Sequence, residues 1–177
     1  MHIELMRDTA KGFPRFDAPS EVTTLRAWHC RYRTFDPIAQ LENLEGLVVA
    51  TYPDPTFDPL CGLRTLRYLS VLHAPKVQTL DPLAALANLE VLSIASLPSW
   101  DASGRVIEVD SLRPLAGLAK LRHVELFGVR PSDGSLRDLE GCPALQSVRV
   151  SKYPSAEVER FRSARRVTDA FAPKPWF

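Results

Sequence analysis

One pattern dominates this sequence: a stretch of fifteen residues that recurs five times without gaps. The copies begin at residues 36, 58, 81, 113 and 137, so their spacings are 22, 23, 32 and 24 residues. Each copy places apolar residues three apart and closes with an alternating apolar pair, as in Leu60, Leu63, Leu66, Leu69 and Val71. A three-residue step suits a short helical or 3-10 turn with one inward face, and the alternation suits a strand with one inward face. The sequence therefore predicts repeating units, each a short helical turn followed by a strand.

Units of this size cannot enclose their own apolar face, so stability requires that neighbours stack into a continuous core. Proline stands at the first helical position of four copies, where a missing N–H costs least. The 32-residue spacing shows that the third unit carries an insertion. We expect one domain in which residues 1–34 form an N-terminal cap, 35–153 hold five repeats with an insertion near 98–108, and 154–177 form a C-terminal helix and tail. Phe171, Trp176 and Phe177 in this tail either fold back as a lid or stay disordered.

The repeat resembles the leucine-rich-repeat family, in the short internalin-like subclass whose unit is written roughly D-x-x-P-L-x-x-L-x-x-L-x-x-L-x-L. The resemblance covers about Leu25 to Ser151. It implies an α/β fold, a right-handed leucine-rich-repeat solenoid with parallel strands on the concave face and short helical, 3-10 or irregular segments on the convex face.

One position departs from the family pattern. The residue three places after the closing apolar residue is usually Asn in this family, whereas here it is Tyr52, Ala74, Leu97, Val129 or Tyr153. The ladder of buried asparagine side chains is therefore absent. We expect the backbone groups at these turns to find other partners, such as Thr51, Ser96 or ordered water.

Strand alternation assigns side chains to the concave face in rows that run across the repeats. For the strand of the N-terminal cap, the predicted outward residues are Ala27, His29 and Arg31. In the repeats, an apolar centre with charged residues at either end resembles the core and rim of a protein interface. The alternative is that small and aliphatic residues simply suit a strand surface. The predicted partner-binding residues, including one in the insertion, are Tyr68, Ser70, Leu72, Val91, Ser93, Trp100, His123, Glu125, Phe127 and Arg149.

Trp100 allows two interpretations. A large amphipathic aromatic residue in an inserted loop is a plausible interface anchor, since such residues dominate binding hot spots. Alternatively, Trp100 packs down and seals the longer loop.

Few residues suggest catalysis or metal binding. His29, His73 and His123, with Glu125 nearby, raise a metal or acid–base hypothesis. However, His29 and His123 lie several repeats apart, and the pair His123 and Glu125 is more typical of an exposed polar contact. The sequence has no glycine-rich phosphate loop and no G-x-S-x-G motif. We therefore expect no enzyme, no cofactor and no metal.

The three cysteines have structural explanations. They are far apart and lack C-x-x-C spacing, so neither a disulfide framework nor a zinc site is indicated. Cys142 shares the register of Leu118 and is predicted to lie in the core. Cys30 is expected to close a strand as Val49 does, and Cys61 to share the register of Ala84.

Charge and hydropathy exclude other classes of protein. With 22 Lys and Arg against 21 Asp and Glu, the chain lacks the positive excess typical of nucleic-acid binding. The N-terminus contains no apolar run of the length found in a signal peptide. No later segment approaches the roughly 20 apolar residues that a membrane span needs.

These observations favour a cytoplasmic, monomeric protein that binds another protein through the concave face and the insertion loop, with no nucleic-acid or membrane partner. A narrower hypothesis is a bacterial inhibitor or immunity-type protein that covers a toxin or the active site of an enzyme. The alternatives are an enzyme, or a protein that binds a small ligand or metal near His123 and Glu125, and a structural fragment of a longer chain.

Overall fold

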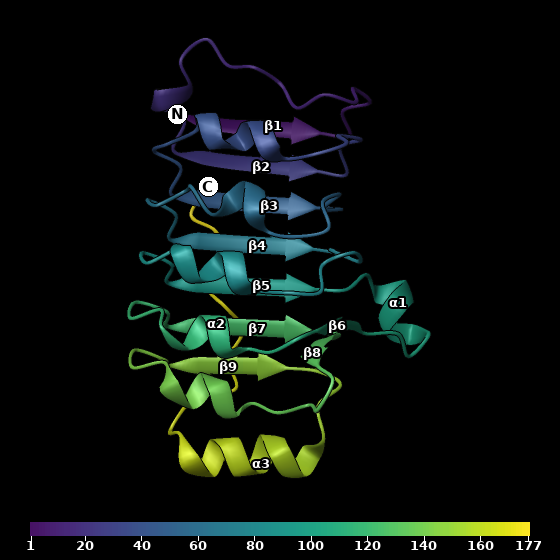
Figure 1. Cartoon of the computed structure of the whole chain (residues 1–177), viewed down its shortest axis with the longest axis vertical. Coiled ribbons are helices and arrows are strands. Elements are labelled where there is room, and N and C mark those ends of the chain that lie inside the picture. The colour runs from purple at the N-terminus through teal and green to yellow at the C-terminus, as the bar shows by residue number, and fades with distance from the viewer.

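A ladder of parallel strands, one for each coil of chain, forms the centre of the molecule (Figure 1). The computed structural model describes the backbone of residues 1–177 and every side chain except that of Asp101, which lies in the predicted insertion. Neighbouring strands pair in register, so that Thr24 lies opposite Gly46 and Gly46 opposite Tyr68. The strands of this seven-stranded sheet follow chain order: β1 (His2–Met6), β2 (Thr24–Trp28), β3 (Gly46–Ala50), β4 (Tyr68–Leu72), β5 (Val91–Ala95), β7 (His123–Phe127) and β9 (Ser147–Val150).

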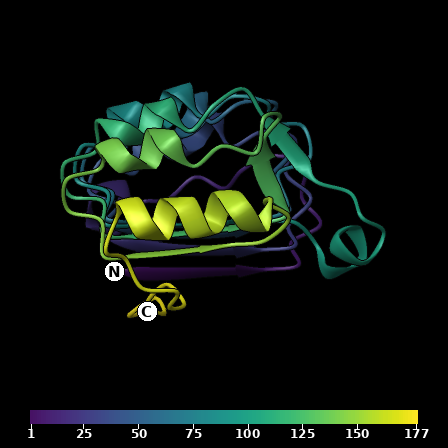
Figure 2. The ribbon, with the colours of Figure 1, turned by 90° about the horizontal axis from the view of Figure 1, so that it is seen from below.

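Short helical segments cover one face of this sheet (Figure 2). At η2 (Asp36–Gln40) and just after it, the N–H of Ile38 donates to the carbonyl oxygen of Phe35, that of Leu41 to Ile38 and that of Leu44 to Leu41, each over 2.8–3.0 Å. The three-residue step of the sequence is thus a run of i to i+3 hydrogen bonds, each aiming an apolar side chain inward. The segments are η1 (Pro19–Glu21), η2 (Asp36–Gln40), η3 (Asp58–Leu60), η4 (Asp81–Ala85), α2 (Arg113–Ala116) and η5 (Arg137–Gly141).

The repeated apolar residues form one continuous core between the sheet and the helical segments. Leu60, Leu63, Leu66 and Leu69 of one repeat are all fully buried. Cys142 is buried in the same layer, and its Sγ–H donates to the carbonyl oxygen of Leu115 over 3.3 Å. The predicted core position of Cys142 is therefore confirmed.

Backbone groups, rather than asparagine side chains, connect the turns that follow the strands. His29, Thr51 and His73 follow β2, β3 and β4 and have φ of 53°, 69° and 67°, in the left-handed region. In this conformation the N–H of Thr51 donates to Leu72 over 2.7 Å and that of His73 to Ala95 over 2.6 Å. The side chains that were expected to bind these backbone groups do not do so. The Thr51 hydroxyl instead lies 3.0 Å from Nδ1 of His29. The Ser96 hydroxyl has no hydrogen-bond partner among the described residues.

Aromatic rings fill the space beside these turns in the N-terminal half. Tyr52 is fully buried between Phe35 and Phe57, with ring centroids 5.5 and 5.2 Å away. Its hydroxyl donates to the carbonyl oxygen of Thr56 over 3.0 Å. A phenol therefore occupies the place of the family's asparagine and still satisfies one backbone acceptor.

The register predicted for the N-terminal cap is wrong. β2 pairs Arg26 with Val48 and Trp28 with Ala50, while Ala27 is fully buried. Ala27 therefore points into the core, and Arg26 and Trp28 point outward. His29 and Arg31 lie beyond the end of β2, as does Cys30, which does not close a strand. The prediction failed because it treated the large apolar side chain of Trp28 as a core residue, which shifts the strand by an odd number of residues and inverts its faces.

Segments outside the seven strands lie at the edge and ends of the stack. α1 (Pro98–Ala102) projects sideways, and β6 (Ile107–Val109) then pairs in parallel with β8 (Val129–Pro131) (Figure 1). α3 (Ser155–Ala164) lies across the last coil. Within the described part of the chain, no helix has the length and apolar character needed to span a membrane.

Candidate functional site

Nine of the ten predicted contact residues lie in three rows on the face of the sheet opposite the helical segments. The pairing aligns Tyr68 with Val91 and Ser70 with Ser93, and each row continues into β7. Their neighbours along the strands are core residues such as Leu69 and Val71, so the outward assignment of strands β4, β5 and β7 is confirmed. The rows are Tyr68, Val91, His123; Ser70, Ser93, Glu125, Arg149; and Leu72, Ala95, Phe127.

The C-terminal tail, defined here as residues 168–177, covers much of this face. Figure 2 shows it beneath the sheet, on the side away from the helical segments. Val48, Tyr68 and Val91 are only 5–7% exposed, and Ala172 and Phe177 of the tail pack against them. The tail therefore folds back, and two residues of the predicted apolar centre, Tyr68 and Val91, are covered by it.

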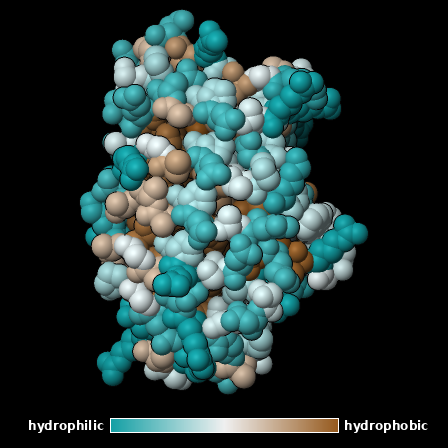
Figure 3. Space-filling model, viewed as in Figure 1, coloured by the Kyte–Doolittle hydropathy of each residue, from teal (hydrophilic) through white to brown (hydrophobic). Residues whose placement is uncertain are grey.

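An apolar hollow of about 460 Å³ lies at the other end of the strands. It is lined mainly by the third row and by the start of the insertion: Leu72, Ala95, Ser96, Pro98, Phe127 and Ser151. By contrast, the helical side of the molecule shows apolar residues scattered among polar ones (Figure 3). The concave face thus combines a covered part and an accessible apolar part.

Trp100 packs against the solenoid beside this hollow. Its ring lies edge-on to His73, with centroids 4.8 Å apart, and the Arg105 guanidinium lies 5.7 Å from the Trp100 ring. Burial lowers the pKa of His73, which favours a neutral imidazole at this position. This packing supports the interpretation in which Trp100 seals the inserted loop.

Arg149 lies beside Phe127, one of the residues that line the hollow. Its guanidinium lies 5.7 Å from the centroid of Phe127 and 3.8 Å from that of Phe171 in the tail. Cation–π contact is most favourable with the cation over the ring within about 6 Å. The Arg149 guanidinium therefore already accepts aromatic rings.

His123 and Glu125 are engaged in contacts that hold the sheet and the tail. The Nδ1 atom of His123 lies 2.8 Å from the Ser147 hydroxyl. Glu125 accepts hydrogen bonds from the Ser93 hydroxyl at 3.0 Å and from the backbone N–H of Ala172 at 3.2 Å. Burial, followed by the charge of Arg122, lowers the pKa of His123. The described residues bring together no group of three or more His, Cys, Asp or Glu side chains that could hold a metal ion.

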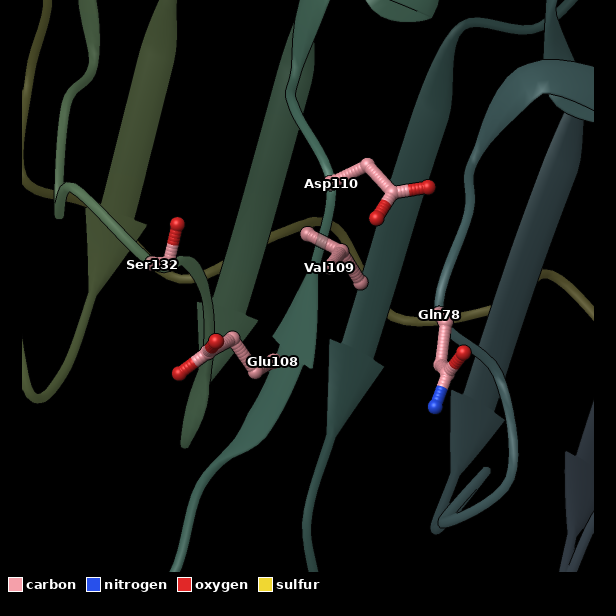
Figure 4. Close-up of a pocket in the computed structure, with 5 residues that line it drawn as sticks. All are labelled: Gln78, Glu108, Val109, Asp110 and Ser132. Atoms are coloured by element: carbon pink, nitrogen blue, oxygen red, sulfur yellow. The ribbon is translucent and has the colours of Figure 1, made fainter.

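A second, polar hollow of about 360 Å³ lies beside β6, lined by Gln78, Glu108, Val109, Asp110 and Ser132 (Figure 4). Glu108 and Asp110 are exposed and lie two positions apart, on either side of the buried Val109 in the sequence. This hollow is lined by polar rather than apolar side chains, and it lies outside the three rows of predicted contact residues. The accessible apolar hollow on the concave face is therefore the stronger candidate site.

Comparisons with known proteins identify the architecture. No family model and no curated relative matches the sequence. Among solved structures, an internalin, InlF, from Listeria monocytogenes matches with a TM-score of 0.57 and 18% sequence identity. The match covers 84% of this chain and 47% of the internalin chain, so the present chain spans about half the length of that protein. Together with the in-register strands and the repeated leucines, this likeness shows that the chain has the leucine-rich-repeat fold, of the internalin-like type.

Proposed function

We propose that this chain is a binding scaffold rather than an enzyme, and that it binds another protein through the concave face. The observation that carries the proposal is the apolar hollow formed by Leu72, Ala95, Phe127 and Pro98. A large side chain that enters such a hollow removes apolar surface from water, and interfaces draw most of their binding energy from a few anchors of this kind.

The border of the hollow favours an aromatic anchor. Arg149 already lies against Phe127 and Phe171, so its guanidinium offers the same contact to an incoming ring. Ser96 lines the hollow and is only 6% exposed, and its buried hydroxyl has no hydrogen-bond partner among the described residues. An anchor with a polar tip, such as Tyr or Trp, would combine apolar burial with a hydrogen-bonding group close to this hydroxyl.

A site-specific crosslinking experiment tests the proposal. We expect p-benzoylphenylalanine at Ser99, an exposed residue at the rim, to crosslink one protein in the native cell, and the same group at Ala39, exposed on the helical side, not to do so. Phe127→Ala and Leu72→Ala should each lower the crosslinking yield, with an affinity loss of about tenfold or more for a central anchor contact. Equal crosslinking from both positions, or full yield in both folded variants, contradicts the proposal.

A narrower form of the proposal concerns the partner and the compartment. We infer that the chain acts as a monomeric inhibitor or immunity-type protein in the cytoplasm, where its cysteines, all free thiols, would stay reduced. The crosslinked partner should then be a toxin or an enzyme whose activity falls when this chain is added. A partner with unchanged activity in the complex contradicts the inhibitor hypothesis and leaves the binding proposal standing.

A further inference from the structure

The C-terminal tail runs across the concave face from β9 toward the N-terminal strands. After α3, Thr168 pairs with β9: its N–H donates to Gln146 over 2.9 Å, and its carbonyl oxygen accepts the N–H of Val148 over 3.0 Å. The chain then passes beneath the sheet and ends close to β3 (Figures 1 and 2). Its path therefore covers part of the concave face through which we propose that a partner binds.

Near β9 and β7, ionic and backbone contacts hold the tail. One carboxylate oxygen of Asp169 lies 2.6 Å from a guanidinium nitrogen of Arg162, and the other lies 3.4 Å from a guanidinium nitrogen of Arg149. The N–H of Ala172 donates to Glu125, whose other oxygen accepts the Ser93 hydroxyl. The predicted polar residues of the second row thus bind a peptide backbone that belongs to the chain itself.

Near β4 and β3, aromatic contacts take over. The rings of Trp176 and Phe177 both lie edge-on to the ring of Tyr68, with centroid distances of 5.8 and 6.1 Å. Arg67 lies 5.7 Å from the Trp176 ring. The carbonyl oxygen of Phe177 accepts a hydrogen bond from Arg26 over 3.2 Å.

Gly46 creates the space for the last ring. A Cβ added at this glycine would lie 2.3 Å from an atom of the Phe177 ring, well inside van der Waals contact. Gly46 opens β3 in register with Tyr68, so the missing side chain leaves a gap in the first row that a ring fills.

Two large apolar side chains of the tail stay exposed to solvent. Phe171 and Trp176 remain 68% and 56% exposed. From Ala172 to Phe177, the hydrogen bonds that join described residues of the tail to the sheet are those with Glu125 and Arg26. Pro173 and Pro175 restrict this stretch to extended conformations, which lowers the entropy lost when it lies down on the sheet.

We propose that the tail is a displaceable occupant of the concave face, and that the partner replaces it with an extended segment of the same chemistry, carrying aromatic side chains. The role of the partner rests on the proposed function, whereas the competition itself involves only this chain. A tethered segment competes for the concave face at an effective concentration in the millimolar range. An untethered copy of the tail therefore binds only to the fraction of molecules in which the tail has left this face.

A labelled peptide with the sequence of residues 167–177, VTDAFAPKPWF, is the probe for this competition. Its binding to four full-length proteins is measured by fluorescence polarisation: wild type, the double variant Trp176→Ala with Phe177→Ala, and that double variant with either Gly46→Val or Gly62→Ala added. We expect the double variant to bind the probe at least about tenfold more tightly than wild type, because its own tail competes poorly. Gly46→Val should abolish this binding by filling the gap for the ring. Gly62→Ala is the matched control, since a Cβ there meets no atom within 4 Å, and should change nothing.

The results that overturn the inference are equally specific. Equal affinity for wild type and the double variant would show that the tail does not compete, and unchanged affinity after Gly46→Val would show that the probe binds elsewhere. No saturable binding to the double variant up to about 1 mM also overturns it, because a tethered tail would then not stay bound. Circular dichroism checks that each variant is folded, and Tyr68→Ala replaces Gly46→Val if the latter is not. The two experiments separate the two proposals. If the tail competes with the peptide but nothing crosslinks at Ser99, the proposed function alone is rejected. If a protein crosslinks at Ser99 but the tail does not compete with the peptide, this inference alone is rejected.

Discussion

Loss of a tyrosine hydroxyl group should lower the stability of the fold at one turn but not at an equivalent one. Tyr52 and Tyr153 both occupy the position that holds asparagine in the family pattern. The Tyr52 hydroxyl donates to Thr56, whereas the Tyr153 hydroxyl is buried without a partner among the described residues. Burial raises the pKa of both phenols, so both remain neutral at ordinary pH.

The expected magnitudes follow from these contacts. Tyr52→Phe removes one hydrogen bond and leaves a carbonyl without its donor, which should lower the free energy of unfolding by about 1 kcal/mol. Tyr153→Phe removes an unsatisfied buried hydroxyl and should be neutral or slightly stabilising. Tyr52→Ala also removes the ring between Phe35 and Phe57 and should cost about 3–5 kcal/mol.

Urea unfolding followed by circular dichroism measures all three variants. For a chain of this length, about 1 kcal/mol corresponds to a change of roughly 2–4 °C in the melting temperature, so thermal unfolding is an independent check. The explanation of the turns would be refuted if Tyr153→Phe lowered stability as much as Tyr52→Phe.

Two further predictions concern titratable groups. Burial raises the pKa of the Cys142 thiol to about 11. Iodoacetamide near neutral pH should therefore label the partly exposed Cys30 and Cys61 first, and Cys142 only in denaturant. Equal labelling of all three cysteines in the folded protein, measured by mass spectrometry, would contradict the core position of Cys142. A hydrogen bond from Arg160, followed by one from the N–H of Leu136, lowers the pKa of Glu157 from 4.5 to about 2. Because the folded pKa is the lower one, this stabilisation is present above about pH 4.5 and is lost as the pH falls toward 2. Glu157→Gln should therefore flatten the dependence of the urea midpoint on pH in this window, and an unchanged pH profile would show that the contact does not stabilise the fold.

The repeats could be predicted from the sequence because their signal is local and occurs five times. Each strand in which the pattern held, such as that of Leu69 and Val71, has its inward and outward residues as expected. In the N-terminal cap the faces of β2 were predicted from that strand alone, and a single tryptophan was enough to invert them.

The tail could not be placed by the same reasoning. Its contacts join Phe177 to Gly46 and Arg26, more than a hundred residues away, and no periodicity marks them. One signal was present: Gly46 interrupts a row that carries larger residues in β4, β5 and β7, such as Tyr68, Val91 and His123. A missing side chain in an otherwise filled row indicates that something else comes close to the backbone there.

The left-handed turns also bear on how such chains can diverge. A bond between peptide groups demands a torsion angle rather than a particular side chain, and the residues with this torsion after the strands are as different as Arg7, His29, Thr51 and Lys152. Substitutions at these positions can accumulate while the coils still stack, provided that the leucines stay. Two solenoids of this kind can therefore share their shape long after their turns have ceased to look alike.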